Sequence, residues 1–276
     1  MSGRWRRRGF LERTVEGLYE AMERALHAEH SAGGGGLLQR LDARVKVAGL
    51  LSLILASALA TRLWVIAAVF ALAVSLATLS LISLRTLAAR VWTGALTFTG
   101  AIAVPALFLT PGAPVLRLPG LHWTITAQGL TTASYLILRV ETAATLALLL
   151  VFTTPWTHVL KALRIFRVPV VFVVILGMTC RYILLMLETA HEMFESRRSR
   201  TVGELTGPVR RRMAVASAGV LLSRTFQLSG DVYLAMQSRG FRGEVYVLDE
   251  FEMTRLDWAA LLAFAALTTA AVWAGR

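Results

Sequence analysis

The apolar residues of this 276-residue chain are gathered into long blocks and are not spread as they would be around a soluble core. Several blocks are long enough to cross about 30 Å of hydrocarbon as a helix, at about 1.5 Å of rise per residue. The five blocks fall at about 47–61, 63–84, 91–110, 128–152 and 256–274. The pattern predicts an all-α integral membrane protein with about five transmembrane helices.

The N-terminal stretch 10–30 is amphipathic. Its apolar residues recur at alternating steps of four and three, which is one face of a helix. They are Leu11, Val15, Leu18, Met22 and Leu26. Because charged residues fill the other faces, this helix is too polar to span. We expect it on the membrane surface or against the protein's own cytoplasmic part, followed by a flexible break at the glycine-rich stretch 31–36.

The loop at about 111–127 contains three prolines. Within it the sequence HWTIT (122–126) alternates polar and apolar residues, which predicts a short hairpin strand. Arg117 is its one Lys or Arg residue, so the loop is expected on the outer side of the membrane.

The stretch 169–187 is strongly hydrophobic, but charge argues against a sixth span there. Arg6, Arg7 and Arg8 place the N-terminus in the cytoplasm by the positive-inside rule, and four spans return the chain to that side. If 169–187 crossed, six arginines would lie outside: Arg197, Arg198, Arg200, Arg210, Arg211 and Arg212. We therefore expect five spans with the C-terminus outside, and six spans are the alternative.

Two long helices are predicted in the region 155–250, which we expect to be cytoplasmic or at the membrane surface, and each ends in a triplet centred on arginine. The first runs from about Val170 to the triplet Ser199-Arg200-Thr201, and the second from about Pro208 to Ser238-Arg239-Gly240. Either triplet alone is explained by an arginine at the negative end of the helix dipole, with Gly240 as a left-handed cap. Two such ends in one cytoplasmic unit offer a partner two guanidiniums that can fork onto carboxylates.

The second long helix is also amphipathic. Wound at the helical period, one half of its surface is apolar. That half contains Leu221, Leu222, Phe226, Leu228, Val232, Tyr233 and Met236. Such a helix needs an apolar partner on one side and faces water or another protein on the other.

The net charge of +12 is assigned to cytoplasmic flanks, because no basic stretch has the interleaved aromatic residues of a nucleic-acid site. The single cysteine, Cys180, excludes an intramolecular disulfide and is expected to be a small buried hydrophobe. No G-x-x-x-x-G-K-[ST] phosphate loop is present. The histidines are scattered, without a tight metal-ligand cluster: His27, His30, His122, His158 and His191.

Three stretches together resemble one known family. They are LLQRLDARVKVAGLL (37–51), RVPVVFVVILGMTCRYILLMLETAHEMFESRRSRT (167–201) and RTFQLSGDVYLAMQSRGFRGE (224–244). In them the chain is similar to the transmembrane T component of energy-coupling factor (ECF) transporters, most closely to the cobalt/nickel branch called CbiQ. The spans between these stretches match only in being hydrophobic.

The resemblance implies a domain layout. Residues 1–36 are the N-terminal helix and linker, 37–152 hold transmembrane helices 1–4, and 255–276 form the last transmembrane helix. Residues 153–254 form a three-helix coupling domain that includes a short helix at about 155–167. In the family the two triplets, here Ser199-Arg200-Thr201 and Ser238-Arg239-Gly240, dock into grooves on two cytoplasmic ATPase subunits. The spacing from Arg181 favours Arg200 as the first docking arginine, although Arg197 and Arg198 lie beside it.

The resemblance also implies a non-catalytic subunit of a transporter in the bacterial inner membrane. ATP is bound by the two ATPase partners, and the metal ion by a separate substrate-binding membrane subunit of the CbiM/NikM type. A small accessory membrane subunit is a further expected partner. This chain then holds no cofactor, and ATP-driven closure of the ATPase pair moves the two coupling helices, which reorient the substrate-binding subunit.

Two other functions are weighed against this one. A permease of an ordinary ABC importer would dock its ATPase through a single coupling loop, for which the stretch 158–169 is a faint match. An intramembrane enzyme would use Glu141 with a histidine, but no second catalytic group lies in sequence reach. Arg139 and Glu141 point to different faces of their helix, and we expect them to meet polar groups between spans or near the substrate-binding subunit.

Overall fold

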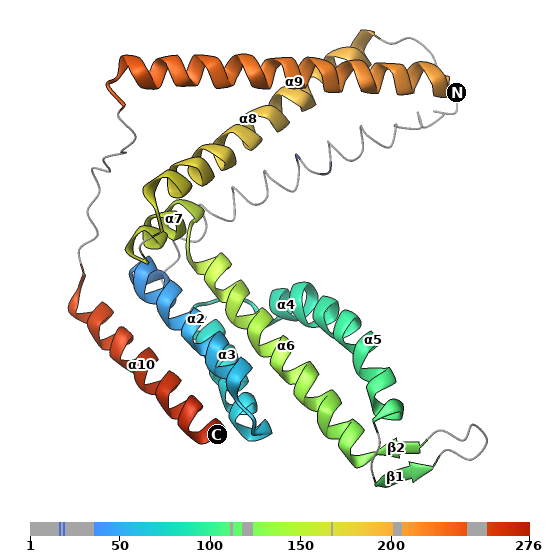
Figure 1. Ribbon diagram of the computed structural model, residues 1–276, viewed down its shortest axis with the longest axis vertical. Helices are drawn as coiled ribbons and strands as arrows, with labels where there is room; N and C mark the ends of the chain where they lie inside the picture. Colours follow the sequence, from blue (N-terminus) through green and yellow to red (C-terminus); the bar gives the residue numbers. More distant parts are fainter. Residues whose placement is uncertain are drawn as a thin grey trace. The chain divides into compact units, whose positions relative to one another are not determined.

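The computed structural model describes Gly17, Tyr19 and residues 36–110, 113–117, 124–166, 168–200, 206–241 and 253–276 (Figure 1). The chain divides into two compact units. We call Ser31–Ala162 with Glu250–Arg276 the bundle unit, and Met1–His30 with Leu163–Asp249 the long-helix unit. The short helix α7, Trp156–Ile165, contains the boundary between them.

The bundle unit is built from five helices that coincide with the five apolar blocks. They are α2 (Ala43–Leu59), α3 (Leu63–Leu79), α5 (Thr93–Leu109), α6 (Ala127–Thr153) and α10 (Arg255–Gly275). The third block is preceded by the short α4, Leu84–Leu87, and by the π-helical turn η2, Ala88–Trp92. The central helix α6 packs against α2, α3 and α5, and α10 packs against α2. The helices expected from the sequence are therefore confirmed in this unit.

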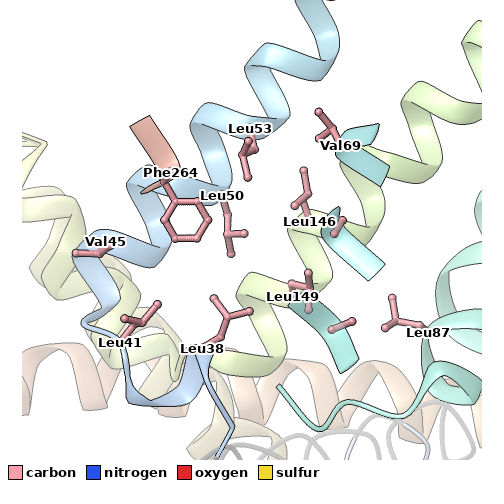
Figure 2. Close-up of a cluster of buried hydrophobic side chains, with 12 residues drawn as sticks. Leu38, Leu41, Val45, Leu50, Leu53, Val69, Leu87, Leu146, Leu149 and Phe264 are labelled. Atoms are coloured by element: carbon pink, nitrogen blue, oxygen red, sulfur yellow. The ribbon is translucent and has the colours of Figure 1, made fainter. Parts of the chain in front are cut away.

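Leucine side chains from four segments form most of the hydrophobic core of the bundle (Figure 2). Leu50 of α2, Leu146 of α6 and Leu38 of the 3₁₀ turn η1, Leu38–Arg40, are fully buried and point toward one another. Phe264 of α10 closes one side. Other apolar side chains face outward and are exposed, as a surface in contact with lipid requires.

The predicted hairpin strand is present between α5 and α6. Strand β1, Pro114–Arg117, pairs antiparallel with β2, Thr124–Thr126. Thr126 also begins α6, because its Oγ1 accepts a 3.0 Å hydrogen bond from the N–H of Gly129. In the described part of the chain, this hairpin is the one departure from an all-helical fold.

The long-helix unit contains the two predicted long helices, α8 (Val170–Arg200) and α9 (Gly207–Ser238). Cys180 of α8 is only partly buried, so the expectation of a buried cysteine is wrong; it lies on a helix that has few neighbours in the described chain. The ring of Tyr19 stacks on His191 of α8, with centroids 4.3 Å apart. This contact supports packing of the N-terminal segment against the protein itself, although the apolar face at 11–26 lies outside the described residues.

Three helices in the described residues are long and apolar enough to cross a membrane, at Ala127–Thr153, Val170–Arg197 and Arg255–Gly275. The shorter apolar helices α3 and α5 have 17 residues each, near the lower limit for a span. Helix α8 thus meets the requirement in length and composition, whereas the arginines that follow it argue against crossing. The five-span topology stays a prediction. It can be tested by labelling near the end of α8, at Glu195.

We expect Gly49→Ala to destabilise the bundle. A Cβ at Gly49 would lie 2.5 Å from ring atoms of the buried Phe264, which is too close unless the ring or one of the two helices moves. Overpacking of this kind costs about 1–3 kcal/mol. The thermal unfolding midpoint of the detergent-purified protein should fall. Gly100→Ala in α5 is the control, because nothing lies within 4 Å of its Cβ position; an equal midpoint in both variants would contradict the close packing.

Candidate functional site: the arginine-tipped helices

Helix α8 ends at an exposed arginine. The helix runs to Arg200, and both Ser199 and Arg200 are exposed. The Ser199 hydroxyl donates a 2.8 Å hydrogen bond to the carbonyl of Ser196 and so helps to close the last turn. Thr201 lies outside the described residues. The first triplet therefore places its guanidinium at a helix end in contact with solvent.

Helix α9 ends in a Schellman motif. The N–H of Gly240 donates to the carbonyl of Gln237 at 2.9 Å, and the N–H of Phe241 donates to that of Met236 at 3.0 Å. Gly240 has a φ of +76°, the left-handed conformation expected of it. Arg239 is the exposed C-cap residue, and nothing lies within 4 Å of the Cβ position of Gly240. A partner surface can therefore approach this tip closely.

Arg197 has a different environment from Arg200. Its Nη1 donates to the carbonyl of Met213 at 2.9 Å and to the hydroxyl of Ser217, both on α9. Ser217 is 1% exposed, so this contact lies in the interface between α8 and α9. The Arg198 side chain lies outside the described part. Of the two arginines whose side chains are described, Arg200 is the one exposed to a partner.

The two arginine tips lie far apart. Arg197 near the end of α8 contacts the first half of α9, and Met186 lies beside Thr225 further along, so the two helices cross in opposite directions (Figure 1). From Met213 to Arg239, α9 rises about 40 Å at about 1.5 Å per residue. A single small groove cannot hold both tips, and the geometry suits two separate docking surfaces.

The apolar half of α9 is open along most of its length. Phe226 is 71% exposed, and Leu222 and Tyr233 are 58% and 61% exposed. These side chains are not covered by the described part of the chain. An exposed apolar face of this extent indicates contact with another protein or with lipid.

The other candidates from the sequence do not form a site with the tips. Arg139 donates through Nη2 to the carbonyl of Ala60 at 2.9 Å, while both carboxylate oxygens of Glu141 are buried without a hydrogen-bond partner in the described chain. Arg139 is thus bound to a backbone carbonyl, whereas Glu141 forms no hydrogen bond through its carboxylate in the described chain. The described residues contain no group of three or more His, Cys, Asp or Glu that could hold a metal. His27, His30 and His122 lie outside them.

One polar cluster was not recognised from the sequence. Lys46 and Asp257, 3% and 2% exposed, lie at the ends of α2 and α10. In the sequence, Lys46 is one of several charged residues at the edge of the first apolar block, and nothing beside it indicates burial. The signal for Asp257 is the capping pattern Thr-x-x-Asp at 254–257, which the structure forms in both directions.

Known proteins similar to this chain were found in two comparisons. A family model described as CbiQ, cobalt transport protein, matches residues 35–247. An uncharacterized protein of Methanocaldococcus jannaschii is 33% identical over 94% of this chain and 89% of its own length. The energy-coupling factor transporter transmembrane protein EcfT of Leuconostoc gelidum subsp. gasicomitatum is 27% identical over 57% of this chain and 64% of its own. The cobalt transport protein CbiQ of Rhodobacter capsulatus is 32% identical over 52% of this chain and 60% of its own.

The different environments of the arginines lead to a stability prediction. Arg197→Met removes charge-assisted hydrogen bonds between α8 and α9, and we expect it to lower the free energy of unfolding by about 1–3 kcal/mol. Arg200→Met should change it by less than about 0.5 kcal/mol, as for other exposed positions. Denaturant unfolding of the purified protein measures both. Equal losses in the two variants would show that the Arg197 contacts add no stability.

Proposed function

This chain belongs to the CbiQ family of cobalt transport proteins, and we propose that it is the transmembrane coupling subunit, or T component, of an ECF-type importer. As a member of this family with long apolar helices, it is a membrane component of a transport system. The observation that carries the proposal is the pair of long helices, each ending in an exposed arginine.

The proposed partners at the arginine tips are two cytoplasmic ATPase subunits. A guanidinium at a helix end has the donors to bind carboxylates or backbone carbonyls of a groove in two directions. The separation of about 40 Å along α9 supports one ATPase subunit for each tip. Arg200 and Arg239 are the docking residues, flanked by Ser199, Thr201, Ser238 and Gly240.

The proposed mechanism is mechanical. Closure of the ATPase pair on ATP moves the ends of α8 and α9, and the open apolar faces pass this motion to a substrate-binding membrane subunit. The chain has no catalytic role, and the partners hold ATP and the metal ion. A small accessory membrane subunit completes the complex.

We assign the transported ion as Co²⁺ or Ni²⁺. The family description and the name of the Rhodobacter relative both say cobalt transport and so support Co²⁺. The proposed location is the inner membrane of a bacterium. The N-terminus and the long-helix unit lie on the cytoplasmic side, as the distribution of arginines favours.

We expect Arg200→Glu combined with Arg239→Glu to release the ATPase subunits. Charge reversal at both tips replaces attraction by repulsion, so ATPase recovered with the tagged chain should fall about tenfold or more. Recovery is measured by affinity purification in detergent. The exposed Arg224 in the middle of α9 supplies the matched control, Arg224→Glu, which should leave recovery unchanged. Full recovery with the double variant, at an unchanged unfolding midpoint, would refute the docking assignment.

The topology can be tested at the end of α8. With Cys180 replaced by alanine, a cysteine at Glu195, whose side chain is 67% exposed, should react with an impermeant maleimide in inside-out vesicles and not in intact cells. A cysteine at Arg276 should show the opposite pattern if five spans are present. Labelling at 195 from outside, together with protection at 276, would establish six spans.

A further inference from the structure

A buried lysine joins the first helix of the bundle unit to the end of the fourth long apolar block. Lys46 lies in the first turn of α2 and is 3% exposed. Its Nζ donates a 2.9 Å hydrogen bond to the carbonyl of Thr153, the last residue of α6. A cation on the last carbonyls of a helix satisfies a group without an intrahelical partner and complements the helix dipole. The end of α6 is thereby attached to the start of α2.

A buried aspartate joins the same end of α2 to α10. The Oδ1 of Asp257 accepts a 2.7 Å hydrogen bond from the N–H of Asp42, the N-cap residue of α2. Its Oδ2 accepts from the N–H and the hydroxyl of Thr254, at 2.9 and 2.6 Å. The carboxylates of Asp42 and Asp257 supply the negative charge that acts on the Lys46 ammonium. Three helix ends thus meet in one buried polar cluster.

The contacts of this cluster lie near the points where the chain passes between the bundle unit and the long-helix unit. The chain leaves the bundle unit after Ala162, within the short helix α7 that follows α6, and returns to it at Glu250, just before α10. The segment Leu163–Asp249 of the long-helix unit lies between these points. Thr153 is the last residue of α6, and Thr254 and Asp257 are at the start of α10. The two connections that lead to and from Leu163–Asp249 therefore each lie close in sequence to a residue bound to α2, Thr153 before one and Asp257 after the other. The third connection between the units, from His30 to Ser31, lies outside the described residues.

We propose that Lys46, Asp42 and Asp257 form a clamp that couples motion of α8 and α9 to the bundle unit. This inference rests on the proposed function and deepens it. Lys46 and Asp257 are positioning residues: they hold the ends of α6 and α10 to one helix, so that displacement of either connection moves α2, α6 and α10 together. Without the clamp, the ends of α6 and α10 move independently of α2, and the displacement that the ATPase subunits cause in α8 and α9 does not reach the rest of the bundle unit.

Polar chemistry suits this role better than an apolar contact does. An apolar cluster resists separation of helices but permits sliding, whereas hydrogen bonds to a defined carbonyl and a defined N–H fix the register of the three ends. Buried charges contribute little net stability, since their desolvation offsets their attraction. The role of Lys46 and Asp257 is therefore to fix the register of the three helix ends rather than to add stability.

The test is carried out on the complex that co-purifies with the tagged chain, reconstituted into liposomes. Three quantities are measured: the ATPase subunits recovered, the rate of ATP hydrolysis, and the uptake of labelled Co²⁺ and Ni²⁺. In Lys46→Met we expect assembly and hydrolysis to persist while uptake per ATP hydrolysed falls about tenfold or more, as loss of a charge-assisted hydrogen bond allows. Lys46→Arg keeps the charge and donors and should restore part of the coupling.

Two further variants separate coupling from folding. Arg40→Met removes an exposed basic residue from the same segment and should leave uptake per ATP unchanged. Lys46→Met combined with Asp257→Asn removes both buried charges, so it avoids the penalty of leaving one unpaired. It should still assemble with the ATPase subunits and be uncoupled, even where the single lysine variant fails to fold.

The outcomes distinguish the clamp from the proposed function. Unchanged uptake per ATP in both the single and the double variant overturns the clamp alone. A fall in uptake that only follows the loss of assembled complex, in both variants, overturns it as well, because a merely structural role predicts that result. A wild-type chain that recruits no ATPase, or whose complex takes up neither ion, overturns the proposed function and the clamp with it.

Discussion

The cost of leaving a polar group without a partner in apolar surroundings constrains every end of the bundle unit. At the end formed by the turn between α2 and α3, the carbonyl of Ala60 accepts from Arg139 at 2.9 Å and that of Thr61 accepts from the Tyr135 hydroxyl. The N–H of Thr61 donates to the carbonyl of Gly275 at 2.9 Å, which ties this turn to the last residue of α10. At the other end, Lys46 donates to the carbonyl of Thr153 at the end of α6, and Asp257 of α10 accepts from the N–H of Asp42. Between its ends the bundle is held mainly by apolar packing, together with hydrogen bonds such as that between the hydroxyls of Ser52 and Thr268 at 3.0 Å.

In contrast to the bundle unit, the long-helix unit has few contacts between its helices in the described residues. Its two helices have 31 and 32 residues, and in the described residues side-chain hydrogen bonds join them at two places: Arg197 with α9 near one end, and Met186 with Thr225 further along. Segments with few buried contacts are those that change arrangement at low cost. A pair of stiff helices joined at few points can change its crossing angle while each helix stays intact. Two stiff helices with few mutual contacts can transmit a displacement along their length to a bundle whose ends are fixed by polar contacts.

The sequence predicts most of the helices because their limits depend on local properties. The run of apolar residues sets the length of α6, and Gly240 after Arg239 sets the left-handed end of α9. The alternation at 124–126 likewise predicts the short strand before α6. Other features depend on partners distant in the chain. Lys46 and Thr153 are 107 positions apart, and nothing near either residue specifies the other. The π-helical turn at Ala88–Trp92 also has no signal in the apolar pattern.

The family resemblance favours Arg200 among the arginines of α8, but the local sequence does not show how their environments differ. Residues 197 and 200 are three apart, and both fit the negative end of a helix dipole. What separates them is the crossing of α8 with α9, which brings the carbonyl of Met213 to Arg197 and leaves Arg200 exposed. A guanidinium whose donors are already bound within the chain must lose those bonds before it binds a partner, so its net contribution to docking is small. An exposed guanidinium exchanges only water for its new acceptors. The same reasoning applies to Arg239, whose position beyond the last turn of α9 keeps it from the apolar half of its own helix.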